Sequence, residues 1–329
     1  MPLDLPLPAA AQGHLRRLNT QRDLESVANL VELCFDDTLD AEGRTYLRNM
    51  RESARSAQWT GWVNSLAEYS PTPPSGLVWE ENGQLVGNLS LIPIICRGQR
   101  CYLIANVAVH PDHRGRGIGR TLTATALDYI RSRNAPSAWL QVRHDNPPAI
   151  HIYQALGFQE RTRRTTWFVS NQAPQVHLPP GTTISSRRRQ HWPQQRQWLQ
   201  RLYPPELSWH LPLDWTLLQP GLVGAIYRLL NLDAPTHWVI QRPNEMLGAL
   251  TWRRIQGHAD PLWLAVPPQP DNEALLALLA YARQRVTPQR PLTVNLPADL
   301  SPDVLRQAGF YPHQTLLWME YAFKTKDER

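Results

Sequence analysis

The segment Arg114–Gly119, which reads RGRGIG, has residue types and an order that suit an anion-binding turn. It follows an extended apolar run, Tyr102–Val109, and a helical pattern of apolar residues begins directly behind it. A strand therefore passes through a glycine-rich turn into a helix N-terminus. Unpaired backbone amides and the positive end of the helix dipole meet at that point, and glycine lets the backbone approach a phosphate closely. The arginines in and behind the turn add positive charge.

The spacing differs from that of two other phosphate-binding loops. A dinucleotide-binding loop has the pattern G-x-G-x-x-G, whereas Gly115, Gly117 and Gly119 alternate here. A nucleotide P-loop ends in Gly-Lys-Ser or Gly-Lys-Thr, whereas Gly119 is followed by Arg120. The alternative without a ligand is a tight turn that begins a helix with glycine.

A second segment places a tyrosine on a short helix. Asn146 suits the N-cap, Pro147 suits the first helical position, and Gly157 suits the residue just past the helix end. Tyr153 lies on this helix. An ordinary amphipathic tyrosine with a buried ring would explain it without any chemistry.

Together, the two segments resemble the cofactor motifs of the GNAT superfamily, acyltransferases that use acetyl-CoA, mostly on amines. The stretch Asn106–Gly119 is similar to motif A, because Arg114, Gly117 and Gly119 fill the pattern Gln/Arg-x-x-Gly-x-Gly/Ala. The stretch Asn146–Phe158 is similar to motif B, an Asn-led helix that ends in Tyr-x-x-x-Gly-Phe. The resemblance covers roughly residues 13–170, about half of the chain.

The resemblance implies a role for each matching residue. Tyr153 would be catalytic and would protonate the thiolate that leaves from CoA, and the amide of Val109 would bind the thioester carbonyl. The implied cofactor-binding residues are Val107, Ala108, Val109, Arg114, Gly115, Arg116, Gly117, Ile118, Gly119, Arg120, Asn146 and Tyr153.

The general base is not evident. Many GNAT enzymes carry a glutamate on the strand before the loop, but Ile104–Val107 holds no carboxylate. An alkylamine with a pKa of about 10.4 is almost fully protonated at neutral pH, so a proton acceptor is needed. The candidates are Asp36, Asp37, Glu80, Glu81 and His144. A water chain, or an acceptor that arrives partly neutral, remains open.

The first half has the element order of a mixed, twisted sheet with helices on both faces. Thr20 and Asp23 suit a capping box for one helix, and a second helix is expected from Ala41 to about Ser56. The segments Leu77–Glu81 and Gln84–Ile95 predict a hairpin. After the loop and its helix we expect a strand at Ala138–Val142, the short helix, and a strand near Thr165–Ser170.

The same order of elements begins again in the second half, and the difference in residue number between matching segments shrinks steadily along the chain. Leu247–Thr251 echoes Val86–Ser90, Ala265–Pro268 echoes Ala108–Pro111, and Ala308–Phe310 echoes Leu156–Phe158. Chance similarity of three short apolar segments is the alternative.

We therefore predict an α/β (α+β) fold of two tandem GNAT-like domains, an organisation similar to that of mycothiol synthase-like enzymes. The expected parts are a flexible N-terminus (residues 1–12), a catalytic domain that binds acetyl-CoA (13–170), a linker (171–181) and a degenerate GNAT-like domain (182–329). The second copy lacks the chemistry, because prolines and no glycine follow Val266 and Leu305 stands at the place of Tyr153.

The composition bears on which partners, metals and cellular location to expect. The net charge of +6 and pI near 9.5 suit a phosphate-rich cofactor, and no recognised motif favours nucleic acid. Three cysteines predict neither a disulfide framework nor a metal site, and His110 and His113 lack the partners that a metal needs. No signal peptide or membrane span is expected, so we predict a cytoplasmic protein, either a monomer or a homodimer.

The predicted function is transfer of an acetyl group from acetyl-CoA to a primary amine of a small molecule or peptide. The alternative is a non-catalytic acyl-CoA-binding or partner-binding protein with the same fold.

Overall fold

The computed structural model describes residues 13–39, 41–55, 75–169, 175, 177–211, 213–221, 234–255, 259–286 and 291–323. The expected flexible N-terminus, residues 1–12, lies outside the described residues, as do residues 171–174 and 176 of the expected linker.

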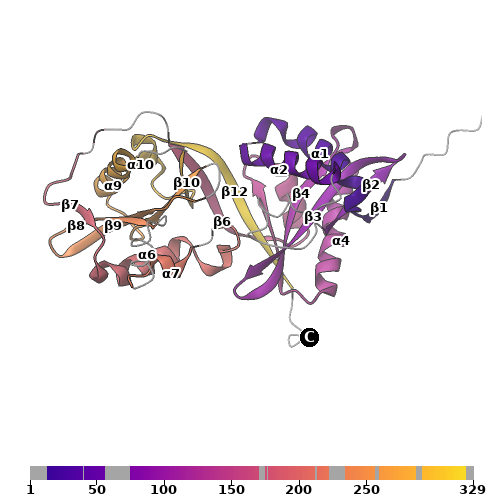
Figure 1. The fold of residues 1–329 in the computed structure, drawn as a ribbon. Helices are drawn as coiled ribbons and strands as arrows, with labels where there is room; N and C mark the ends of the chain where they lie inside the picture. Colours follow the sequence, from indigo (N-terminus) through magenta and orange to yellow (C-terminus); the bar gives the residue numbers. More distant parts are fainter. Residues whose placement is uncertain are drawn as a thin grey trace, which may run out of the picture. The chain divides into compact units, whose positions relative to one another are not determined.

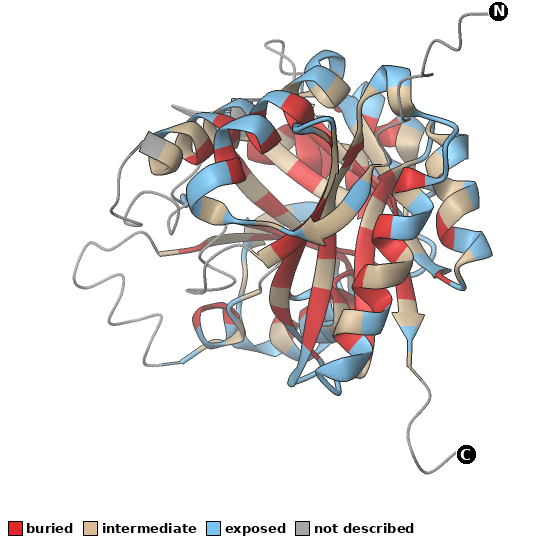
Figure 2. Cartoon of the chain, turned by 90° about the vertical axis from the view of Figure 1, so that its right-hand side faces the viewer, coloured by how far each residue is buried: buried red, intermediate tan, exposed pale blue. Residues whose placement is uncertain are grey.

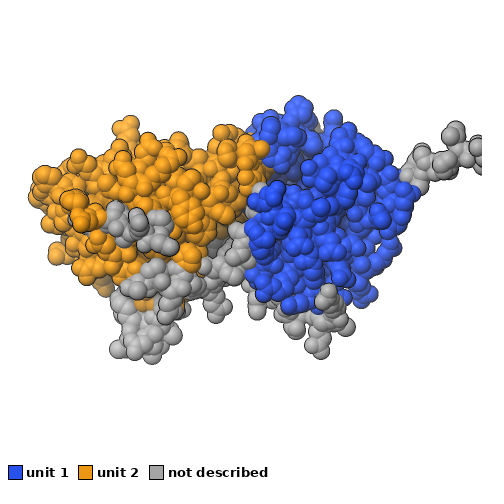
Figure 3. All heavy atoms as spheres, turned by 90° about the horizontal axis from the view of Figure 1, so that it is seen from above, with its two compact units in different colours: residues 1–141, 146–159, 319–329 blue, residues 142–145, 160–318 orange. Residues whose placement is uncertain are grey.

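The chain forms two compact units, which Figure 3 colours blue and orange. Unit 1 contains residues 1–141, 146–159 and 319–329, and unit 2 contains residues 142–145 and 160–318. This division differs from the expected linear one at residues 13–170 and 182–329, because the last strand of each half does not stay with its own half.

Unit 1 is built on a mixed sheet with helices (Figure 1). Its elements, in chain order, are β1 (His14–Arg17), α1 (Thr20–Phe35), α2 (Ala41–Arg55), β2 (Ser75–Glu81), β3 (Gln84–Cys96), β4 (Gln99–Val109), α4 (Ile118–Ser132), β5 (Ser137–Arg143) and α5 (Pro147–Ala155). The strand order is β1-β2-β3-β4-β5, followed by the C-terminal end of β12 (Phe310–Ala322). Strands β1 to β4 pair antiparallel, and β4 pairs parallel with β5.

Unit 2 repeats this order of elements. They are β7 (Thr183–Ser186), α6 (Trp192–Leu202), α7 (Trp215–Leu218), β8 (Thr236–Arg242), β9 (Glu245–Trp252), β10 (Asp260–Ala265), α9 (Asn272–Arg285), β11 (Leu292–Pro297), α10 (Pro302–Gln307) and β12. Strands β7 to β10 pair antiparallel and β10 pairs parallel with β11, as in unit 1. Gly157 and Gly309, which end α5 and α10, both have positive φ, at 98° and 75°. The predicted fold class and the internal repeat are thus confirmed.

The final strands are exchanged between the two halves. β6 (Gln159–Val169) follows α5 in the sequence but pairs antiparallel with β11 of unit 2, with Val294 opposite Trp167. The strand at the equivalent place in the second half is β12, and its C-terminal end beyond Trp318 belongs to unit 1. There the ring of Tyr321 lies 5.6 Å from that of Phe158. Each half therefore needs the other half's last strand to complete its sheet.

Each unit has its own hydrophobic core. Figure 2 shows buried residues in red along the strands and on the helices. In unit 1, Leu24, Val27 and Val31 of α1 pack with residues of α2 and with Val78 and Ala108 of the sheet. On another surface of this sheet Gly87 lies against α4, where an added Cβ would come within 2.9 Å of Ile118. Strand β3 therefore needs glycine at that position to let α4 approach.

Two local predictions were wrong. The N-cap of α1 is Asn19 and not Thr20: its side chain accepts hydrogen bonds from the amides of Gln21 and Arg22, while Asp23 accepts one from the amide of Asn19. The strand expected near Thr165 begins at Gln159, because pairing in the sheet extends over a polar stretch that has no apolar alternation.

Candidate active site

The glycine-rich turn leaves the N-terminus of α4 open. Gly115 and Gly117 have φ of 76° and 79°, and a Cβ at either position would meet nothing within 4 Å. Their conformation therefore favours glycine, and an added Cβ would have room beside them. Gly117 is the N-cap of α4, and no side chain in the described part of the chain caps the helix. The first amides of α4 and the helix dipole can thus act on an anion.

The three arginines differ in their engagement. Arg114 donates from Nε to the carbonyl oxygen of Val109 over 3.2 Å. Arg116 forms an ion pair with Glu81, with 3.1 Å between Nη2 and Oε1. Arg120 is exposed and has no hydrogen bond or ion pair to another residue that the structure describes. Arg120 is therefore the arginine that is available for a phosphate, whereas Arg114 holds the turn against β4.

Strand β4 has a free edge beside the turn. Its parallel pairing with β5 covers Tyr102, Leu103 and Ile104, and the last pair is Ile104 with Leu140. Beyond Ile104 the two strands no longer pair, so among the described residues positions 105–109 of β4 have a partner strand on the β3 side only. The expected cofactor-binding residues Val107, Ala108 and Val109 lie on this stretch.

A β-bulge decides which amides face that edge. Asn88 pairs with Ala108 but Ser90 pairs with Ala105, so that Leu89 lies opposite two residues of β4, 106 and 107. Asn106 takes the left-handed conformation, with φ of 51°.

The amide of His110 donates to the carbonyl oxygen of Val86 over 2.9 Å. Because hydrogen-bonded and non-hydrogen-bonded positions alternate in an antiparallel pair, the backbone groups of Val109 point away from β3, toward the free edge. The carbonyl oxygen of Val109 accordingly accepts from Arg114 and from Sγ of Cys34. Without the extra residue, the alternation would turn the amide of Val109 toward β3.

Tyr153 lies on α5 as expected. The side chain of Asn146 caps this helix, with its Oδ1 3.2 Å from the amide of Ala149, so the predicted cap is confirmed. The ring of Tyr153 is buried, 5.9 Å from that of Phe158. Burial raises the pKa of Tyr153 to about 12. The phenol therefore stays protonated at neutral pH, which a general acid requires.

Two of the candidate bases, Glu80 and Glu81, form ion pairs with arginines, and Glu81 also lies near a histidine. Glu80 accepts from Nε of Arg16 over 2.7 Å and from Arg22, and the hydrogen bond from Arg16 lowers the pKa of Glu80. Glu81 pairs with Arg116 and lies 3.8 Å from Nε2 of His113. A carboxylate with a lowered pKa is a poor proton acceptor, so Glu80 does not suit the role.

For the other candidate bases, Asp36, Asp37 and His144, no contact with residues 105–109 of β4 is seen among the described residues. Asp36 pairs with Arg44 at 3.6 Å, Asp37 is exposed, and Nδ1 of His144 lies 3.3 Å from the carbonyl oxygen of Thr315.

Unit 2 differs at each of these places. Its α9 is capped by Asp271, whose carboxylate accepts from the amides of Glu273 and Ala274. These hydrogen bonds, together with that from Arg242, lower the pKa of Asp271. Strands β9 and β10 pair regularly, from Leu262 with Trp252 to Ala265 with Ala249, with no bulge in that stretch. A fixed negative charge thus occupies the helix end that is open in unit 1.

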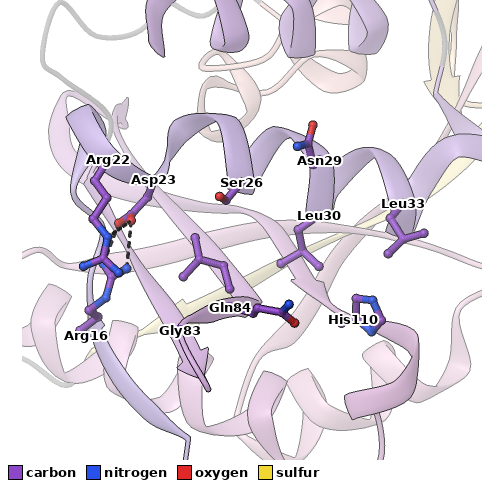
Figure 4. Close-up of a pocket in the computed structure, with 11 residues that line it drawn as sticks. Arg16, Arg22, Asp23, Ser26, Asn29, Leu30, Leu33, Gly83, Gln84 and His110 are labelled. Carbon is purple, nitrogen blue, oxygen red and sulfur yellow. Dashed lines mark hydrogen bonds and ion pairs between the residues drawn. The ribbon is translucent and has the colours of Figure 1, made fainter. Parts of the chain in front are cut away.

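A separate cavity of about 470 Å³ lies in unit 1 beside α1 and the β2–β3 turn. Figure 4 shows Arg16 and Arg22 directed at Asp23 toward one end of the cavity and His110 toward the other. Neither Tyr153 nor any residue of the glycine-rich turn lines it. The open helix end and the free edge of β4 are therefore distinct from this cavity.

Sequence patterns missed the side chains that hold the bulge. Tyr46 of α2 and Asn88 and Ser90 of β3 all lie around Asn106. The available signal was an asparagine inside an apolar strand, because asparagine is enriched among non-glycine residues with positive φ.

Comparison with known proteins identifies the family that this part of the chain resembles. The profile of the "Acetyltransferase (GNAT) family" matches residues 30–158, which include the turn, the free edge and α5. The chain carries a GNAT acetyltransferase domain.

Curated relatives match this domain over part of their length. The [Ribosomal protein bS18]-alanine N-acetyltransferase of Salmonella typhimurium is 40% identical over 67 residues, 20% of this chain and 45% of the relative. The mycothiol acetyltransferase of Corynebacterium kroppenstedtii is 35% identical over 88 residues, 27% of this chain and 20% of the relative. The chain thus matches less than half of the length of these relatives.

The whole chain resembles solved GNAT structures. A GCN5-related N-acetyltransferase from Sphaerobacter thermophilus aligns with a TM-score of 0.55 and 15% identity, over 97% of this chain and 98% of that protein. The similarity extends through both units and supports the same fold for the second one.

The residues that the structure describes include no helix with the length and apolar character needed to cross a membrane. They also include no group of three or more His, Cys, Asp or Glu side chains arranged to hold a metal ion.

Proposed function

We propose that the protein is an acetyl-CoA-dependent N-acetyltransferase whose donor site lies in unit 1. The observation that carries this proposal is the coincidence of an uncapped helix N-terminus and a free strand edge on consecutive elements, β4 and α4. A long donor with phosphates at one end and a thioester at the other fits such an arrangement. GNAT enzymes use acetyl-CoA, and this chain's own residues fit that donor.

The diphosphate of the donor would bind at the turn. The amides that follow Gly115 and Gly117 and the positive end of the α4 dipole favour negative charge there. Arg120, which pairs with no residue that the structure describes, adds a positive charge. Arg114 would act indirectly, because it fixes the carbonyl of Val109. The side chain of Asn146 caps α5 and so contributes by holding the helix that carries Tyr153.

The acyl end would lie along the free edge of β4. The nitrogen of a neutral amine attacks the thioester carbonyl carbon, and negative charge develops on the carbonyl oxygen. The amide of Val109, which faces the edge, can donate to that oxygen.

Collapse of the intermediate breaks the C–S bond, and the phenol of Tyr153 gives its proton to the departing thiolate sulfur. The amide product loses its extra N–H proton to water, which also reprotonates Tyr153, so that free CoA thiol and an N-acetyl product result.

The acceptor belongs to the amine class. The relatives are named for transfer to alanine of a ribosomal protein and for mycothiol, which favours an amine and leaves its size open. We place the second unit in a non-catalytic role, since Asp271 occupies its helix end. We propose a cytoplasmic location, since the proposed donor is available there.

The test is release of free CoA thiol when the full chain is incubated with acetyl-CoA and a panel of primary amines. Acetylated product, identified by mass, with thiol release in equal amount supports the proposal. Tight acetyl-CoA binding without transfer to any amine would instead support a non-catalytic acyl-CoA-binding protein.

A further inference from the structure

The bulge in β4 is costly for the chain. The left-handed conformation costs a typical residue other than glycine about 1–2 kcal/mol and asparagine less, and Asn106 adopts it with φ of 51°. The bulge also leaves one residue outside the regular pairing with β3. Strain of this kind persists where surrounding contacts impose it, and it is concentrated at functional sites.

Side chains from two other elements converge on Asn106. Its Nδ2 donates to the hydroxyl of Tyr46 on α2 over 2.8 Å and to Oγ of Ser90 over 3.4 Å. Nδ2 of Asn88 donates to the backbone carbonyl of Asn106 over 2.9 Å. Hydrogen bonds therefore hold both the side chain and the backbone carbonyl of Asn106. We call Tyr46, Asn88, Ser90 and Asn106 the bulge clamp.

The clamp is a polar group at the margin of the apolar core, with Tyr46 and Asn106 half-buried. Asn88 is fully buried, Ser90 is 5% exposed, and Ala108, which pairs with Asn88, packs into the core with α1 and α2. Burial raises the pKa of Tyr46, so its hydroxyl stays neutral and acts as a hydrogen-bond partner only. Oδ1 of Asn88 has no hydrogen-bond partner among the described residues, which adds to the cost. A core without this cost would be more stable, so stability alone does not account for the clamp.

Unit 2 shows that the fold does not need the bulge. Its strands β9 and β10 take the same places without a register shift. Thr251 stands at the repeat position of Ser90, but its hydroxyl contacts Gln195 and His237 instead of a residue of β10. The bulge occurs in the unit that also has the open helix end, and it is missing in the unit that has neither the glycines nor the tyrosine.

We propose that Asn106 is a positioning residue, held by Tyr46, Asn88 and Ser90, that keeps the amide of Val109 directed at the acyl carbonyl of the donor. The assignment rests on the proposed transferase function. The clamp shifts the alternation of β4 by one residue, and this shift is what turns the Val109 amide outward. The clamp touches neither substrate nor the reacting atoms and acts through the backbone of β4.

The test compares variants by their preference for acetyl-CoA over CoA. Both ligands carry the same phosphates, but only acetyl-CoA has the carbonyl that the Val109 amide would bind. Binding constants for both ligands are measured by calorimetry on the full chain with Asn106→Ala, Asn106→Gly and Tyr46→Phe. We expect CoA affinity within about twofold of wild type, loss of most of the acetyl-CoA preference, and a kcat lower by about 100-fold in Asn106→Ala with little change in KM.

Two comparisons separate positioning from simple destabilisation. Asn106→Gly keeps the left-handed backbone but loses the side-chain contacts, so it should behave like Asn106→Ala; full activity in this variant would overturn the role of the clamp. Tyr203→Phe removes a buried hydroxyl of unit 2, whose partner is the amide of Leu264, and should change melting temperature without changing the ligand preference.

The outcomes also separate this proposal from the proposed function. A wild-type protein that binds CoA and acetyl-CoA equally would refute the positioning role even if it acetylates amines. A wild-type preference that the Asn106 variants lose would support the positioning role even if no amine in the panel were acetylated, and only the transferase function would then fail.

Discussion

Replacement of Gly117 by glutamate should abolish donor binding while leaving the fold intact. Gly117 has φ of 79° and an added Cβ would meet nothing within 4 Å, so the cost to the folded chain is only backbone strain of about 1–2 kcal/mol. The new carboxylate would stand at the open end of α4, where the donor's diphosphate is proposed to bind. At about 5 Å and an effective dielectric constant of about 20, two unit charges repel by about 3 kcal/mol. That energy alone weakens binding by about 100-fold or more.

The measurement is calorimetric titration with CoA, combined with thermal melting with and without CoA. Gly98→Glu is the matched control, because Gly98 has φ of 75°, is equally open and lies in the β3–β4 turn. Both variants should melt a few degrees below wild type, but only Gly98→Glu should keep the CoA-induced rise in melting temperature. A Gly117→Glu protein with the wild-type rise would refute the assignment of the turn as the phosphate site. The repulsion should also weaken as salt is added.

Four further outcomes are expected. Tyr153→Phe should lower the transfer rate by roughly 10²–10⁴-fold with CoA binding retained, and less with a donor whose thiol leaves readily; unchanged turnover would return Tyr153 to a packing role. Since burial raises the pKa of Tyr153 to about 12, the neutral acid persists and the pH–rate profile of wild type should show no alkaline loss from this group below about pH 10. Titration of the full chain should give one CoA per chain, because Asp271 fills the helix end of unit 2; two sites of similar affinity would contradict this. Since hydrogen bonds lower the pKa of folded Asp271 below its unfolded value of about 3.9, its stabilisation is present above that value and is lost as pH falls through the folded pKa; Asp271→Asn should flatten the loss of melting temperature below about pH 4.

Local sequence patterns predicted most helices and strands of both units, because turns, helix caps and helix ends depend on residues close in sequence. The hairpin around Asn82-Gly83, the Asn146 cap and the glycine at 157 depend on neighbours within a few residues, and each was found where the sequence indicated. The repeat was visible because β9, β10 and the end of α10 keep the apolar residues of β3, β4 and α5.

Long-range pairing could not be read in the same way. Strand β6 pairs with β11, which lies more than a hundred positions later in the sequence. The residues of an apolar strand do not determine which strand it pairs with. The exchange of β6 and β12 therefore changed the domain boundaries but hardly any element within them. For the same reason a fragment that begins near residue 181 would keep the segment 319–329 that completes unit 1, so ligand binding is better assigned with variants of the full chain than with isolated halves.

The two units form an internal comparison that isolates what the donor site requires beyond the fold. Both have the antiparallel strands, the parallel crossover through a helix and the glycine after the short helix. Among the described residues, unit 1 adds the left-handed glycines at 115 and 117 before its crossover helix, where unit 2 has none. Unit 1 also has the left-handed asparagine that unit 2's regular β9–β10 pairing does without. Each addition costs stability, through backbone entropy, strain or a buried polar group. Unit 2 has replaced the open helix end with an Asp271 cap and the bulge with regular pairing, and both replacements are the stabilising choice. These costly features occur together in unit 1, and their combination supports the proposal that the donor site lies in this half.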